Sequence, residues 1–202
     1  MDFINNTLYW LTTGMLVPVI LFLLLFFVRS LMMIGSLYGR YISRAKINAR
    51  IRRGLDEMSV ADLLRSLETY PRDNALVASL ERMYRRRGSA PALDREIGDY
   101  EIIADKELSK SKLLVKIGPM LGLMGTLIPM GPALTGLATG DVASMAQNMQ
   151  VAFATTVVGI VIGAVGFISL QVGSRWWADD MNILEYVAES LKESAAGSNA
   201  KK

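Results

Sequence analysis

The 202-residue chain contains neither cysteine nor histidine. Without cysteine it can form no disulfide, zinc finger or iron–sulfur cluster. Without histidine it lacks the commonest general base and the commonest metal ligand, so it can build no catalytic triad that uses His or Cys. The glycine patterns GxGxxG and GxxxxGK[ST], which bind nucleotides, are also absent. These absences argue against an enzyme, and we expect neither a metal nor a cofactor.

Charge is missing from three long stretches of an otherwise charged chain. They are residues 3–28, 117–140 and 142–174. Each exceeds the roughly 20 residues that cross a bilayer. The first has no basic region before it, and no small-residue cleavage site follows it, so we interpret it as a retained membrane helix rather than a secretory signal. The lipid bilayer is therefore one expected partner.

Positive charge is distributed very unevenly. Of the 22 Lys and Arg residues, 18 lie between Arg29 and Lys116, and the other four lie from Arg175 onward. Because positive residues that flank membrane helices stay in the cytoplasm, we expect a multi-pass protein of the cytoplasmic (inner) membrane with its N-terminus outside and its C-terminus cytoplasmic. Arg85–Arg87 fits this rule, or a lipid-headgroup contact, better than a nucleic-acid site, since few aromatic residues are interleaved with the cations. No nucleic-acid partner is expected.

The segment between the first two spans has helical spacing throughout. A helix is expected to begin at Ser59 and to end at Tyr70–Pro71, and Asp73 is expected to cap the next one. Apolar residues then recur at helical steps in two groups: Leu76, Leu80 and Met83, and, after Pro91, Leu93, Ile97, Tyr100 and Ala104. The second group can continue into the second span, and the first span can extend inward past Arg29.

The sequence thus predicts an all-α integral membrane protein with three transmembrane helices that extend into a cytoplasmic helical region. The expected segments are an outer tail and first span (1–39), a cytoplasmic region (40–112), a second span (113–140), an outer link and third span (141–175), and a cytoplasmic helix and tail (176–202).

No span interior contains Asp, Glu, Lys, Arg or His, although a proton pathway generally needs a titratable group at membrane depth. Either the chain carries no protons, or a partner brings the titratable group. Hydroxyl and amide residues indicate a polar lining all the same. The candidates are Thr126, Thr155 and Thr156 for the pore, and Gln147, Asn148 and Gln150 for its outer entrance. The alternative is that each threonine only bonds back to a carbonyl of its own helix.

Small residues predict close packing of the second and third spans. Gly118, Gly122 and Gly125 lie at near-regular steps in one, and Gly159 and Gly163 form a GxxxG step in the other. Proline lacks an amide donor, so Pro129 and Pro132 predict a kink or an irregular outer end of the second span, which is a candidate lining or hinge element.

Two short runs in these spans resemble the MotA/TolQ/ExbB proton-channel family. The run from Gly118 to Thr126 (GPMLGLMGT) is similar to the family's GLLGT segment, and the run from Ala152 to Gly159 (AFATTVVG) is similar to its ALxxTAxG segment. The similarity covers about residues 112–175, while earlier residues agree in layout. The length and the three spans suit the shorter TolQ/ExbB branch.

The resemblance implies a homopentamer around a dimer of a single-span partner of the ExbD/TolR/MotB type. That partner helix carries an essential Asp, and ion flow drives rotation of the pentamer around the dimer. Thr126 and Thr156 match the family's pore-facing threonines. TolQ and ExbB have a Glu five residues before the second of these, where this chain has Val151. The choice between proton and sodium therefore stays open.

The preferred function is an ion channel subunit, with the proton as the preferred ion, of a motor complex driven by the ion-motive force. An alternative is a structural membrane scaffold whose cytoplasmic helices recruit a soluble partner. A membrane enzyme is disfavoured by the lack of His, Cys and intramembrane acids.

Overall fold

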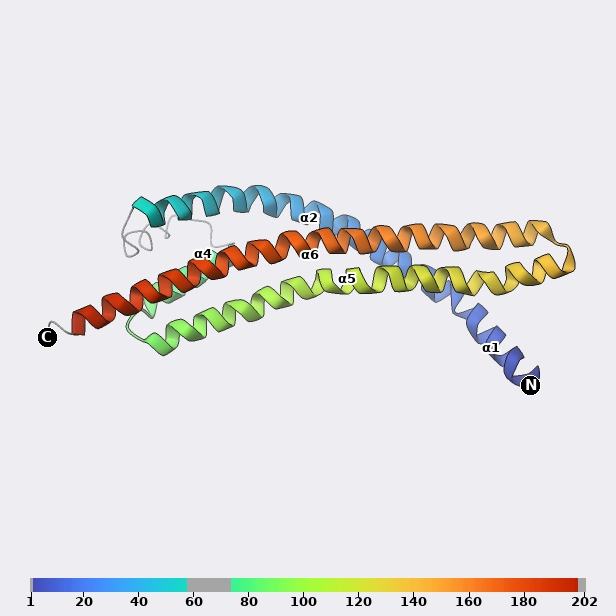
Figure 1. Cartoon of the computed structure of the whole chain (residues 1–202), viewed down its shortest axis with the longest axis horizontal. Helices are drawn as coiled ribbons and strands as arrows, with labels where there is room; N and C mark the ends of the chain where they lie inside the picture. The colour runs from blue at the N-terminus through green and yellow to red at the C-terminus, as the bar shows by residue number, and fades with distance from the viewer. Residues whose placement is uncertain (1, 58–73, 200–202) are drawn as a thin grey trace. The chain divides into compact units, whose positions relative to one another are not determined.

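A computed structural model describes residues 2–57 and 74–199, and this part of the chain is almost entirely α-helical, with no strand. The helices are α1 (Asp2–Gly14), α2 (Leu16–Glu57), α4 (Ala75–Arg85), α5 (Ala90–Thr139) and α6 (Val142–Asn199) (Figure 1). The all-α prediction is confirmed. The helix expected from Ser59 and the cap expected at Asp73 lie outside the described residues.

Three of these helices are long and apolar enough to cross a membrane, as the sequence predicted. The candidate spans lie within Leu16–Tyr41, Ala90–Thr139 and Val142–Ala195. The expected continuity is also confirmed, because α2 runs on past Arg29 and α5 passes from the charged segment into the second span without a break.

The start of the first span differs from the prediction. The charge-free stretch 3–28 was interpreted as one membrane helix, but a turn at Met15 divides it into α1 and the beginning of α2. Pro18 has no amide hydrogen, so the helical bond to the carbonyl of Gly14 cannot form. The bonds on either side persist, from the Met15 amide to the Leu11 carbonyl and from the Val19 amide to the Met15 carbonyl. The membrane-length helix therefore begins at Leu16.

The described chain divides into two compact units, which are treated separately below. Unit 1 comprises Met1–Leu37 and Lys110–Leu170, and unit 2 comprises Tyr38–Ser109 and Gln171–Lys202. Unit 1 holds the charge-free parts of α2, α5 and α6, whereas unit 2 holds most of the charged residues.

Unit 2 has an apolar core that includes five of the periodic residues that the sequence indicated, namely Leu76, Leu80, Met83, Leu93 and Tyr100. Its members are Ile51, Leu76, Val77, Leu80, Met83, Leu93, Tyr100, Ile183, Leu184, Val187, Ala188 and Leu191. The Asn74 side chain begins α4 by accepting the Leu76 amide at 3.0 Å. An N-cap of this kind satisfies one of the amides that a helix start leaves free.

In unit 1, α5 and α6 are joined by a tight turn. Gly140 adopts φ 74°, a conformation that favours glycine because a side chain there would be strained. The Asp141 carboxylate accepts the Ser144 amide at 3.0 Å and so caps the start of α6. Helix α5 includes Pro119, Pro129 and Pro132 and still appears as one uninterrupted ribbon (Figure 1). The prolines thus leave no irregular segment in α5 where it approaches the turn at Gly140.

Candidate functional site

The polar and small residues singled out in the sequence meet where α5 and α6 run antiparallel in unit 1. The buried positions of α6 recur at alternating steps of three and four. They are Ala152, Thr155, Gly159, Ile162, Gly166 and Ser169, and Gly163 beside Ile162 is buried as well. This spacing is that of a coiled-coil seam, and small residues at such a seam let two backbones approach closely.

The glycines set the distance between the two helices. A Cβ added to Gly159 would lie 2.7 Å from both the Gly118 carbonyl oxygen and the Gly122 Cα. A Cβ on Gly118 would lie 2.9 Å from the backbone of Gly159 and Gly163. Since real Cβ atoms are not found so close to backbone, neither helix can accept a larger residue here without moving.

Gly163 packs against a proline rather than another glycine. A Cβ added there would lie 2.9 Å from the Pro119 ring. A helical proline leaves the carbonyl four residues earlier without its usual amide partner, and in α5 that carbonyl belongs to Val115. Gly163 lies close enough that its added Cβ would be 3.8 Å from this oxygen. Proline and glycine together therefore allow α6 to cover the freed carbonyl.

The three threonines occupy different environments. Thr155 is buried and faces Gly125, where an added Cβ would be 2.6 Å from the Thr155 Cβ. Thr126 and Thr156 are each half-buried, one residue beyond the closed seam on their helices. The structure therefore places Thr155 in the contact between α5 and α6 and the other two at its margin.

All three hydroxyl groups bond within their own helix, as the alternative interpretation expected. Thr126 donates to the Leu123 carbonyl at 2.7 Å, and Thr156 donates to the Ala152 carbonyl at 3.1 Å. Thr155 Oγ1 lies 3.0 Å and 2.9 Å from the carbonyl oxygens of Val151 and Ala152. A hydroxyl that donates its proton in this way still has an oxygen lone pair to offer. Thr126 and Thr156 can therefore act as acceptors on a partly exposed surface.

The three residues expected at the pore entrance lie in the first turns of α6. Gln147 and Gln150 are exposed, and the half-buried Asn148 donates to the Ser144 carbonyl at 2.9 Å. Pro129 is buried at the helix contact, and Pro132 is half-buried. The entrance candidates and the pore candidates Thr155 and Thr156 thus lie in the first part of α6, with residues 151–154 between them.

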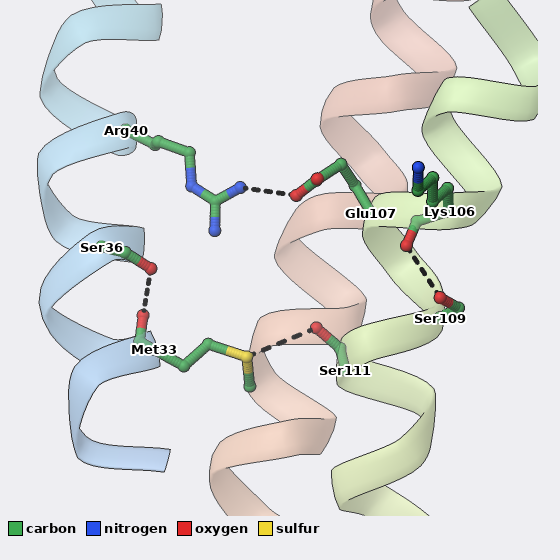
Figure 2. Close-up of polar contacts among 7 residues, drawn as sticks. All are labelled: Met33, Ser36, Arg40, Lys106, Glu107, Ser109 and Ser111. Atoms are coloured by element: carbon green, nitrogen blue, oxygen red, sulfur yellow. Dashed lines mark hydrogen bonds and ion pairs between the residues drawn. The ribbon is translucent and has the colours of Figure 1, made fainter. Parts of the chain in front are cut away.

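Helix α2 completes unit 1 through an apolar cluster and one polar contact. Leu23 packs with Leu114 and Ile162 in a buried cluster. Figure 2 shows the Ser111 hydroxyl of α5 directed at the Met33 sulfur of α2, at 3.8 Å. The polar surface of α2 in this unit is small, so the candidate site is built by α5 and α6.

Unit 2 contains a buried polar cluster that the sequence did not reveal. The Arg44 guanidinium pairs with the Asp180 carboxylate, which also accepts the Tyr100 hydroxyl at 2.7 Å. Asp180 is fully buried. Arg44 also lies between two indole rings, 5.6 Å from the Trp176 centroid and 5.2 Å from that of Trp177. These groups connect α2, α5 and α6.

The same cluster keeps the tyrosine protonated. Tyr100 precedes the charge-free stretch that begins at Ile117. Burial, and then the Asp180 carboxylate, raise the pKa of its phenol well above the ordinary value. The phenol is therefore a permanent hydrogen-bond donor to Asp180. A second link between α2 and α5 in this unit is the exposed pair of Arg40 and Glu107 at 3.5 Å (Figure 2).

The described residues hold no group of three or more Asp and Glu side chains that could bind a metal ion. Within the charge-free stretches 117–140 and 142–174, the polar groups are limited to hydroxyls, amides and backbone carbonyls. Such a surface can bind water or accept a proton-bearing group, but it contains nothing that titrates.

Comparison with known proteins agrees with this chemistry. Neither the curated proteins nor the solved structures include a significant match to the chain. The profile of the MotA/TolQ/ExbB proton channel family matches residues 63–185, which is more than half of the chain and includes most of α5 and α6. Three membrane-length helices, the small-residue seam and this match lead to one conclusion: the chain is a multi-pass membrane protein that belongs to the MotA/TolQ/ExbB proton channel family.

Proposed function

We propose that the chain is the channel subunit of a motor complex driven by the ion-motive force. Five copies surround a dimer of a single-span partner of the ExbD/TolR/MotB type, and the partner helix supplies the titratable Asp. Family membership supports the channel role. The absence of Asp, Glu, Lys, Arg and His from the charge-free stretches supports a carboxylate brought by another protein. The proton is the preferred ion.

One observation carries this proposal: Thr126 and Thr156 lie half-buried beside a seam that is otherwise closed by small residues. Their hydroxyl protons are already donated within the helix, so each oxygen is available as an acceptor. A protonated carboxyl or a water chain on the partner side can donate to them. Thr155 lies in the contact between α5 and α6, the two helices that form this wall.

The proposed orientation follows from charge. All 22 Lys and Arg residues lie at or after Arg29 and outside the second and third charge-free stretches. This pattern supports a cytoplasmic (inner) membrane location with the N-terminus and the α5–α6 turn outside. Gln147, Asn148 and Gln150 then lie at the outer mouth of the ion path. We expect the segments 40–112 and 176–202 to be cytoplasmic.

The test is ion flux through the purified complex in vesicles, read with a pH-sensitive dye. Thr156→Val keeps the shape of the side chain but removes its acceptor, so flux should fall by roughly ten-fold, the rate equivalent of about 1.4 kcal/mol. Thr156→Ser keeps the hydroxyl and should retain most of the flux. Thr7→Val removes a similarly back-bonded hydroxyl from α1 and serves as the matched control. Normal flux in correctly assembled Thr156→Val would contradict the pore role.

The scaffold alternative predicts the opposite pattern. Function would survive changes at Thr126 and Thr156 but would be lost on changing exposed residues of the cytoplasmic helices. Deleting residues 56–95 is a poor test, because Leu76, Leu80 and Leu93 belong to the core of unit 2. Ile102→Gln is cleaner, since Ile102 is 68% exposed and its replacement leaves that core intact.

A further inference from the structure

Two groups of charged side chains with opposite sign lie on the surface of unit 2. The basic surface is formed by the end of α4 and the turn that follows it. Its members are Arg82, Arg85, Arg86 and Arg87, of which Arg82 is half-buried and the others are exposed. The acidic surface lies on α6. Its members are the exposed Glu185, Glu189 and Glu193, which recur every four residues and so fall within an arc of about 80°.

The basic surface has more cations than the carboxylates beside it neutralise. The buried Glu96 pairs with both Arg82, at 2.6 Å, and Arg86, at 3.8 Å. Arg85 pairs with a glutamate one turn earlier in α4. Arg87 lies over an aromatic ring of the same helix, 4.4 Å from its centroid, and no ion pair joins it to a described residue. Among the described residues, four cations thus meet two carboxylates, and the basic surface stays positive.

The acidic surface is also only partly compensated. Glu189 pairs with Lys192 at 3.6 Å, and Lys192 also binds Asp94 of α5 at 2.8 Å. Within the described part of the chain, no cation pairs with Glu185 or Glu193. Like charges four residues apart destabilise a helix. This column of glutamates therefore costs stability in an isolated copy, and cations from another molecule would offset that cost.

The two surfaces lie at one level of α5 and on nearly opposite sides of it. Glu96 holds the basic surface, and Asp94 holds the acidic surface through Lys192. These two carboxylates are two residues apart, which is about 3 Å along a helix and about 200° around it. In a closed ring, each copy meets its two neighbours through different patches at the same height. The charges of unit 2 are placed as such a ring requires.

We propose that the basic surface of one copy binds the acidic surface of the next copy around the ring. The proposal deepens the five-copy complex proposed above and rests on it. The contact is head-to-tail, so it is repeated at every junction between copies. A second copy is the occupant that fits both surfaces, because each surface carries the charge that the other lacks. An anionic phospholipid would cover the basic surface alone and leave the glutamates uncompensated.

The natural absence of cysteine allows this contact to be tested by cross-linking. Arg87→Cys and Glu193→Cys are placed on two differently tagged full-length chains, which are produced together and treated in membranes with a short bifunctional thiol reagent. The mixture should give a product that carries both tags. Either variant alone should give little product, since identical surfaces do not meet in a head-to-tail ring.

The native mass of the complex before cross-linking reports the number of copies separately. A five-copy complex without the mixed product, or equal cross-linking of each variant alone, would overturn the contact. A mixed product from a complex with another number of copies would support the contact and contradict the five-copy assembly. A failure of the contact is thus distinguished from a failure of the proposed function.

Charge exchange adds a check that does not depend on the reach of a cross-linker. Arg87→Glu or Glu193→Arg alone should lower the fraction of intact complex in native mass measurements several-fold, because like charges then face each other. Both changes in one chain should restore the complex, which a folding defect would not allow. Arg95→Glu is the matched control, because the exposed Arg95 lies at the same level of α5 and belongs to neither surface.

Two results of this exchange would overturn the proposal. One is unchanged assembly in both single variants, or no recovery in the double variant. The other is loss of co-purified phosphatidylglycerol from Arg87→Glu while assembly is unchanged, because an anionic lipid would then be the occupant of the basic surface.

Discussion

Gly159 is the point at which α6 comes closest to the backbone of α5. Gly159→Ala would place a methyl group 2.7 Å from backbone atoms of Gly118 and Gly122. The two helices must then separate, at a cost of about 1–3 kcal/mol typical of overpacking. We expect a lower midpoint of thermal unfolding for the detergent-solubilised protein. Gly35→Ala is the control, because an added Cβ there meets nothing within 4 Å. Equal midpoints for the two variants would show that the seam is looser than described.

Tyr100 is the buried donor that stabilises Asp180 in unit 2. Tyr100→Phe removes the 2.7 Å hydrogen bond, so the buried Asp180 carboxylate loses one of the donors that offset the cost of its burial. Hydrogen bonds to charged groups contribute about 1.5–3 kcal/mol, so a loss of that size in the free energy of unfolding is expected. Tyr186→Phe makes the same change at a residue that is 56% exposed and should be neutral. Chemical denaturation of both variants in detergent measures the difference, and a neutral Tyr100→Phe would contradict this role.

At the scale of single elements, α4 depends on its cap. This helix has 11 residues, and Asn74 satisfies one of its free amides. Asn74→Ala should destabilise the start of α4 by about 1 kcal/mol, whereas Asn74→Ser keeps a capping oxygen. Hydrogen exchange of the Leu76 and Val77 amides reports the effect directly. Faster exchange in Asn74→Ala but not in Asn74→Ser is expected, and identical exchange in the two variants would exclude a capping contribution.

The helices themselves were largely predictable from the sequence, because they depend on local patterns. Charge-free length indicated three spans, and 3.6-residue spacing indicated the buried faces around Leu80 and Leu93. The division at Met15 was not predicted, because the residues on both sides of Pro18 are hydrophobic and gave no sign that the helix is interrupted there. The pairing of Arg44 with Asp180 could not be predicted from the sequence, because the two residues are 136 positions apart and their contact depends on how the helices pack.

The candidate site was predicted in composition more than in geometry. Glycine and threonine spacing indicated that α5 and α6 approach closely. It could not separate Thr155, which fills the space beside Gly125, from Thr156, which lies at the margin one residue later. A step of one residue turns a side chain by 100° on a helix, and only the packed pair of helices shows which direction faces the neighbour. The alternating steps of Ala152, Thr155 and Gly159 were the signal that could have identified the seam.

At the scale of the whole molecule, the proposed function leaves the titratable group to another protein. Its three charge-free stretches offer acceptors but no Asp, Glu, Lys, Arg or His that could relay a proton. Purified alone and reconstituted, it should therefore give no more proton flux than empty vesicles. The complex isolated by a tag on this chain from its native membrane should conduct, and its native mass should correspond to five copies of this chain and two of a single-span protein. Replacing the partner's membrane Asp with Asn should return the flux to the level of the chain alone, because the amide cannot titrate. Steady flux through the chain by itself would instead mean that its hydroxyls and backbone carbonyls support a continuous water path, and the carboxylate from a partner would then be unnecessary.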